Sequence, residues 1–187
     1  LPLSKKTKSI HVAGIGANDI GMQCGGWTLE WQGKMGAITE GTTILDGIKS
    51  TVSKKTEITY SKDGLGGENA EVGIIVIGEE PYAEGIGDKE NLSLSKQDIL
   101  VIENMKKLNI PLVVVMLSGR PLIVSDEINS WDAFIAAWLP GTEGDGISDI
   151  LFGNYKPTGK LAFSWPKSMD QIPHDYKSNT VKPLFDY

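Results

Sequence analysis

The sequence is poor in cysteine, because Cys24 is the only cysteine among its 187 residues. A single thiol cannot form an internal disulfide, and it leaves no pair or quartet of cysteines spaced for zinc. These absences exclude a small fold stapled by disulfides and a cysteine-based zinc module. They leave the redox compartment of the protein open.

Long apolar runs and an excess of basic charge are also missing. The longest apolar stretches, such as residues 110–117, are far shorter than the roughly 20 residues that a membrane-spanning helix needs. The formal net charge is -6, and no basic stripe marks a surface suited to a phosphate backbone. We therefore expect neither a membrane nor a nucleic acid as a partner.

The first residues lack the features of a secretory signal. Residues 1–8 have no charged start, apolar middle and small-residue cleavage site, and no initiating Met precedes them. We expect the chain to be a piece of a longer protein, with any signal lying upstream.

Apolar runs rich in β-branched residues alternate with segments of helical spacing. The composition, 40% hydrophobic and 22% charged, suits one sizeable core, so we expect residues 1–187 to form a single α/β domain. Strands alternating with helices predict a mostly parallel sheet with helices on both faces, a three-layer αβα sandwich. Ser95 is the expected N-cap of the second helix. The expected strands are 10–13, 58–60, 72–77, 112–117 and 134–138, the expected helices are 44–52, 99–108 and 147–151, and 156–165 are expected to enter a late strand.

Ligands of such sheets collect beyond the carboxyl ends of the strands, which directs attention to the loops that follow them. The first loop begins with Gly14 and Gly16 and invites comparison with a dinucleotide-binding turn. The match fails, because a Rossmann fingerprint has glycine at the position that Asp19 occupies. A carboxylate there would lie near the pyrophosphate. The other loops of interest are 78–88, 118–121 and 139–146.

The first loop continues with Trp27 and Trp31, four residues apart among glycines and polar residues. Tryptophan offers a flat apolar face to the CH side of a pyranose ring and an indole N–H to a hydroxyl group. The residues alone therefore indicate a sugar-binding loop. The alternative, that both rings cover the sheet as ordinary core, stays open.

The loop after the third strand carries three glutamates, Glu79, Glu80 and Glu84. Glycoside hydrolysis needs two carboxyl groups, one of which protonates the leaving oxygen. Glu84, flanked by small residues, is the best placed to reach out of the loop, although a cluster of charges in a loop is most often just solvated. Arg120 follows the fourth strand and could pair with a carboxylate, but a structural turn is the favoured interpretation of its segment.

Taken together, these segments resemble glycoside hydrolase family 3, in the branch of plant and bacterial exo-β-glucanases and β-glucosidases. The likeness covers nearly the whole chain, and the blocks keep the family's order and spacing. The matching blocks are 17–33, ending QCGGWTLEWQG, then 78–84 (GEEPYAE), 118–121 (SGRP), 136–144 (AAWLPGTEG), 150–155, 158–161 and 165–168.

The resemblance implies a fold, an activity and a set of site residues. In this branch an N-terminal barrel carries an aspartate nucleophile, and the following α/β sandwich donates the general acid/base, which falls on Glu84. The resemblance also implies that Trp31 forms one side of an aromatic clamp around the sugar on the leaving side, with Trp27 nearby. It implies a retaining β-glucosidase acting on β-linked glucosides and oligosaccharides, with no metal or organic cofactor, in the periplasm or outside the cell.

No carboxylate of this chain matches the family's nucleophile motif, so neither Glu79 nor Glu80 is promoted to that role. The barrel domain is the expected partner, and the chain alone is expected to be inactive. Two other classes are the alternatives, a non-catalytic carbohydrate-binding or scaffold domain and a small nucleotide-binding module. Glu84 beside the tryptophan loop favours the catalytic domain, and the nucleotide-binding module would require phosphate-cradling glycines that the chain lacks.

Overall fold

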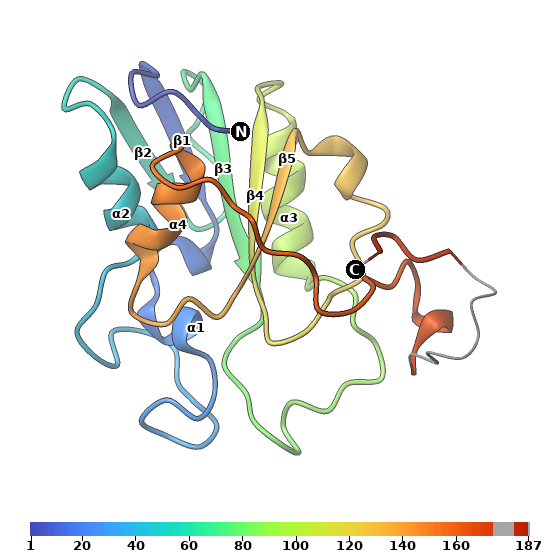
Figure 1. The fold of residues 1–187 in the computed structure, drawn as a ribbon. Helices are drawn as coiled ribbons and strands as arrows, with labels where there is room; N and C mark the ends of the chain where they lie inside the picture. The colour runs from blue at the N-terminus through green and yellow to red at the C-terminus, as the bar shows by residue number, and fades with distance from the viewer. Residues whose placement is uncertain (174–181, 187) are drawn as a thin grey trace.

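A sheet of five parallel strands forms the centre of the computed structural model, which describes residues 1–173 and 182–186 (Figure 1). The strands pair in the order β2-β1-β3-β4-β5, and every pairing is parallel. Each strand predicted from the five β-branched or apolar runs is present. The strands are β1 (Ser9–Ala13), β2 (Glu57–Ser61), β3 (Val72–Gly78), β4 (Leu112–Leu117) and β5 (Ala133–Trp138).

Helices cover both faces of this sheet. One face packs against α2 (Ile44–Thr51) and α4 (Gly144–Leu151), and the other packs against α3 (Lys96–Lys106). The predicted α/β fold with helices on both faces is therefore confirmed. The remaining helical segments are short: α1 (Ile20–Cys24) and the 3-10 turns η1 (Ile15–Asn18), η2 (Ile128–Ser130) and η3 (Met169–Gln171).

The central strands are apolar throughout because both of their faces are buried. In β3, Ile74 and Val76 point to the cluster under α2 and α4, whereas Ile75 and Ile77 point to the cluster under α3. The two-residue alternation of a strand divides one apolar run between two cores. The sheet thereby becomes a rigid platform for the loops that leave its carboxyl edge.

Helices α2 and α3 each begin with a side-chain cap. The Thr43 hydroxyl accepts a hydrogen bond from Asp46 N–H at the start of α2, and the Ser95 hydroxyl accepts one from Asp98 N–H at the start of α3. The prediction for Ser95 is confirmed. Within the described residues, no helix combines the length and the apolar composition that crossing a membrane would require.

The late strand predicted over residues 156–165 is wrong. In the described part of the chain, this segment contributes an isolated bridge between Trp165 and Phe185 rather than a strand. Trp165 is buried in the cluster under α3, and its indole N–H donates to the carbonyl of Leu122 at 2.8 Å. The apolar residues of this segment therefore reflect packing over the sheet and not a sixth strand.

Candidate active site

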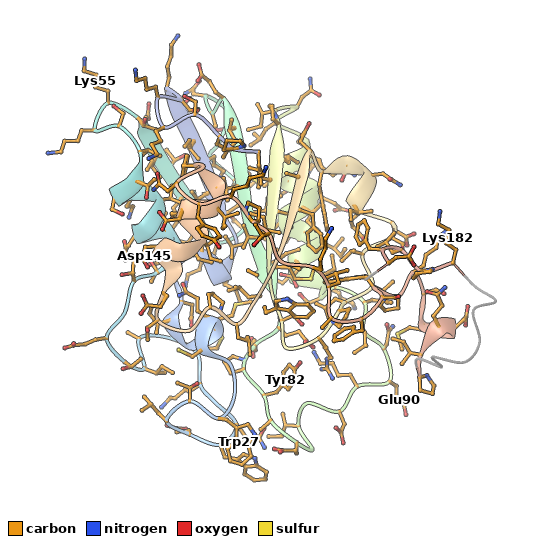
Figure 2. The ribbon with its side chains drawn as sticks, in the orientation of Figure 1. Trp27, Lys55, Tyr82, Glu90, Asp145 and Lys182 are labelled. Carbon is orange, nitrogen blue, oxygen red and sulfur yellow. The ribbon has the colours of Figure 1, made fainter. Side chains whose placement is uncertain are left out.

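The loops that follow β1 and β3 meet at the carboxyl edge of the sheet. Figure 2 places Trp27 and Tyr82 at this edge, while Lys55 lies at the opposite end of the molecule. The segment after β4 also reaches this edge and contacts the β3 loop through Arg120. The first candidate site is therefore the meeting of these loops, as expected for a parallel sheet.

The tryptophan loop exposes both of its rings. Trp27 is 70% exposed and Trp31 is 56% exposed, and their ring centroids are 6.2 Å apart with an interplanar angle of 53°. The alternative that these rings form ordinary core is therefore wrong. Large exposed aromatic faces on a loop are unusual without a ligand or a covering surface.

Hydrogen bonds hold this loop in a tight hairpin-like turn against backbone strain. Trp27 N–H donates to the carbonyl of Trp31 at 2.9 Å. Trp27 and Leu29 have φ values of 62° and 65°, a left-handed conformation that disfavours bulky residues. At the base of the loop, the Asp19 carboxylate accepts from Met22 N–H and Gly36 N–H, each at 2.8 Å to Oδ1. Asp19 therefore caps α1 and pins the returning chain, which explains the residue that broke the dinucleotide motif.

Glycines let the tryptophan loop touch the backbone of the β3 loop. A Cβ atom on Gly26 would lie 2.0 Å from the carbonyl oxygen of Tyr82, and one on Gly33 would lie 2.6 Å from Cβ of Pro81. Side chains at these two positions would force the loops apart. The glycine-rich composition thus serves a close approach of two loops.

Glu84 lies on the tip of the β3 loop and points its carboxylate at Trp31. The side chain is exposed, and its Oε2 accepts a hydrogen bond of 2.9 Å from the indole Nε1 of Trp31. This bond, followed by one from the backbone of Glu84 itself, lowers the pKa of the Glu84 carboxyl from its ordinary value of 4.5. The predicted site residues Glu84, Trp31 and Trp27 therefore come together in one cluster.

Glu79, at the start of the same loop, is buried at the centre of a charged network. Its Oε1 lies 2.8 Å from Nη2 of Arg120 and 2.9 Å from Nζ of Lys89. Its Oε2 accepts from the hydroxyl groups of Tyr82 at 2.9 Å and Ser118 at 2.8 Å. The Arg120 guanidinium also stacks over the Tyr82 ring, 4.5 Å from its centroid. Arg120 thus pairs with a carboxylate and anchors its own turn.

Arg120 and Lys89 hold Glu79 in its ionised form near neutral pH. Burial by itself would raise the pKa of Glu79, but hydrogen bonds from Arg120, Lys89, Ser118 and Tyr82 outweigh it and lower the pKa. Burial of the Tyr82 hydroxyl group, followed by its hydrogen bond to Glu79, raises the pKa of Tyr82 to about 12. A carboxylate so neutralised cannot serve as a proton donor near neutral pH.

Gln32 was not among the residues predicted from the sequence. Its side-chain oxygen accepts from Ala83 N–H at 2.8 Å, and its Nε2 donates to the carbonyl of Glu84 at 3.1 Å. The available signal was weak: a polar side chain directly after Trp31 in a loop of glycines. Spacing within one segment does not reveal a partner 51 residues away.

The site is open. A cavity of about 240 Å³, lined by residues that include Thr28, Glu30 and Lys34, lies beside the tryptophan loop. A second cavity, of about 40 Å³, lies beside Glu79 and Tyr82. Both are smaller than the roughly 300–1,000 Å³ of pockets that enclose small ligands. In the described ranges, no group of three His, Cys, Asp or Glu side chains is arranged to hold a metal ion. Neither cavity is large enough to enclose a small ligand.

Comparison with known proteins places this chain in a family. Residues 1–187 match the model of the glycosyl hydrolase family 3 C-terminal domain. The chain is 30% identical to a lysosomal beta glucosidase of Dictyostelium discoideum, an alignment that covers 100% of this chain and 26% of the relative. It is 30% identical to a periplasmic beta-glucosidase of Salmonella typhimurium, over 98% of this chain and 28% of the relative. The chain therefore spans about a quarter of the length of these curated relatives.

Solved structures agree with the sequence relatives. The crystal structure of an exo-1,3/1,4-beta-glucanase from a Pseudoalteromonas species superposes with a TM-score of 0.90 at 43% identity, covering 100% of this chain and 25% of that one. A beta-glucosidase from Listeria innocua in complex with isofagomine superposes with a TM-score of 0.80 at 27% identity, over 98% of this chain and 26% of that one. The resemblance found from the sequence motifs is confirmed, and the chain belongs to glycosyl hydrolase family 3 as a C-terminal domain of that family.

Proposed function

We propose that this chain is the acid/base-bearing domain of a retaining β-glucosidase that removes terminal β-D-glucosyl residues from β-glucans and oligosaccharides. The observation that carries this proposal is the 2.9 Å hydrogen bond between Trp31 and the exposed carboxylate of Glu84. This hydrogen bond places a carboxyl group that can transfer a proton beside two exposed aromatic rings. Glycoside hydrolysis uses such a carboxyl group, and aromatic rings bind sugars. The relatives named beta-glucosidase and exo-1,3/1,4-beta-glucanase support the substrate class.

In the proposed reaction, an aspartate of an N-terminal barrel attacks the anomeric carbon while Glu84 protonates the departing oxygen. Glu84 then accepts a proton from the water that releases the sugar. Retention requires the two carboxyl groups to approach to about 5–5.5 Å. Trp31 would stack on the sugar of the leaving side, with Trp27 nearby, and the chemistry needs no metal or organic cofactor.

The exposed position of Glu84 at the loop tip suits a site that is shared with another domain. A general acid must hold a proton near the working pH, yet hydrogen bonding at the exposed loop tip favours the ionised form. Covering by a barrel would desolvate Glu84, and the charge of the nucleophile would oppose its ionisation. We therefore propose that residues 1–187 act as a single α/β domain that is inactive without its barrel partner.

The test is Glu84→Ala in the full-length enzyme, with a disaccharide and 2,4-dinitrophenyl β-glucoside as substrates. We expect kcat/KM for the disaccharide to fall by about 10²–10⁴-fold, because its leaving group needs protonation. We expect kcat/KM for the dinitrophenyl glucoside to change little, because that leaving group departs unprotonated. Azide should restore turnover and give a β-glucosyl azide.

Glu90→Ala is the matched control, because Glu90 is an exposed glutamate in the same connection between β3 and α3. It should leave both substrates unaffected. Equal losses for the two substrates in Glu84→Ala, without azide rescue, would contradict the acid/base role and favour a non-catalytic carbohydrate-binding or scaffold domain.

A further inference from the structure

The side chain of Gln32 grips the main chain on both sides of the Ala83–Glu84 peptide. One carboxamide supplies the acceptor for Ala83 N–H at 2.8 Å and the donor for the Glu84 carbonyl at 3.1 Å. Two such bonds fix two points of the backbone, as one rung of a β-ladder does. These two hydrogen bonds therefore restrict backbone rotation between Ala83 N–H and the Glu84 carbonyl.

Two backbone hydrogen bonds close the turn around Glu84, from Gly87 N–H to the Ala83 carbonyl at 2.9 Å and from Asp88 N–H to the Gly85 carbonyl at 3.1 Å, but neither ties the turn to another segment. Gly85 has a φ of 81°, and a Cβ atom there would meet nothing within 4 Å, so the position after Glu84 is unpacked. Ile86 is 71% exposed. The neighbouring residue Trp31 binds the carboxylate of Glu84, while Gln32 binds its backbone.

We propose that Gln32 is a positioning residue that acts through Glu84 and sets where the acid/base carboxyl lies relative to the scissile oxygen. This inference rests on the proposed acid/base role of Glu84. Displacing a reacting group by about 1 Å is enough to lower a rate by about 10²-fold. Loss of the two hydrogen bonds at the backbone of Glu84 is therefore expected to lower the rate strongly.

The chemistry of the contact explains why a glutamine fits. The site needs a donor and an acceptor in one planar group at one side-chain length, a combination that glutamine provides. Glutamate would turn a second acceptor toward the Glu84 carbonyl and bring a negative charge close to the Glu84 carboxylate. Leucine keeps comparable bulk but loses both hydrogen bonds.

The experiment is a double-mutant cycle of Gln32→Leu and Glu84→Ala in the full-length enzyme. Gln32→Leu alone should lower kcat/KM for the disaccharide by about 10–100-fold and leave that for the dinitrophenyl glucoside within about 3-fold. In the Glu84→Ala background, Gln32→Leu should have no further effect, because the group that it positions is gone. The same loss in both backgrounds would overturn the inference.

Gln171→Leu is the matched control. The Gln171 side chain bridges the backbone in the same manner, accepting from Lys167 N–H at 2.6 Å and donating to the Lys182 carbonyl at 3.1 Å. Lys182 lies far from Trp27 in Figure 2. The control should leave the ratio between the two substrates unchanged. A changed ratio in Gln171→Leu would show that the ratio reports general loosening, which would also overturn the inference.

Gln32→Glu provides a second measurement in case Gln32→Leu does not fold. It keeps the acceptor for Ala83 N–H and adds a negative charge near Glu84, which should raise the pKa of the acid and move the alkaline limb of the kcat/KM profile to higher pH. An unmoved limb would contradict positioning through Glu84. The arm with Glu84→Ala alone tests the proposed function separately, because its two-substrate ratio does not depend on Gln32.

Discussion

Two glutamates of the β3 loop, Glu79 and Glu84, stand five residues apart and lie in opposite surroundings. Glu79 is 6% exposed and is bonded to two cations and two hydroxyl groups, whereas Glu84 is exposed and bonded by an indole N–H. Both carboxyl groups have a lowered pKa, so the direction of the shift does not separate their roles.

The causes of the two shifts do separate them. Glu79 is ionised because Arg120, Lys89 and two hydroxyl groups bind its buried carboxylate, and another domain docking on the loop would hardly alter that. Glu84 is ionised because of hydrogen bonds at an open surface, where covering or a nearby charge can reverse the shift. This difference supports the proposed acid/base role of Glu84, whereas Glu79 anchors the loop.

The largest expected effect on stability comes from Glu79→Gln. Removing the negative charge leaves Arg120, whose side chain is 24% exposed, partly buried without a counter-charge, and we expect a loss of about 3 kcal/mol in the free energy of unfolding. The Lys89 pair adds little, because that side chain is 46% exposed. Urea unfolding of the 187-residue chain measures the change.

Glu84→Gln is the matched variant for the same measurement, and its urea midpoint should equal that of the wild type. If the two variants lost similar stability, the contrast between an anchoring glutamate and an exposed one would be wrong.

Acid titration sharpens the same contrast with a smaller effect. Since the folded-state pKa of Glu79 is below its ordinary value of 4.5, its ionised form stabilises the fold fully above that value, and the contribution is lost as the pH falls through the folded-state pKa. The stability difference between wild type and Glu79→Gln should therefore be constant above about pH 5 and shrink below it. A difference that grew on acidification would mean that Glu79 is not held ionised by its cations.

The fold could be predicted because it depends on local patterns. Apolar runs such as 72–77 and 112–117 and the cap at Ser95 are visible in the sequence, and a parallel sheet with helices on both faces follows from their alternation. The late strand at 156–165 was mispredicted because alternating apolar residues also arise where a segment packs over a sheet, as Trp165 does. Periodicity does not distinguish these cases.

The site was only partly predictable. Family resemblance selected Glu84, Trp31 and Trp27, and the structure brings these three residues together. The partnership of Glu79 with Arg120 and the grip of Gln32 on the β3 loop join segments far apart in the chain. Contacts of this kind depend on the order of strands in the sheet, which a single sequence does not state.

The smallest expected effect concerns the strained tryptophan loop, which contrasts with the relaxed helix α3. Leu29 has a φ of 65° and is 73% exposed, so Leu29→Gly removes left-handed strain and forfeits little packing. After the entropy that glycine adds to the unfolded chain, we expect a gain of about 0.5–1 kcal/mol. Leu100→Gly, at an exposed helical leucine, should instead lose about 1 kcal/mol. Opposite signs in urea unfolding would show that the tryptophan loop is held against its own backbone preference, whereas equal losses would mean that Leu29 is packed rather than strained.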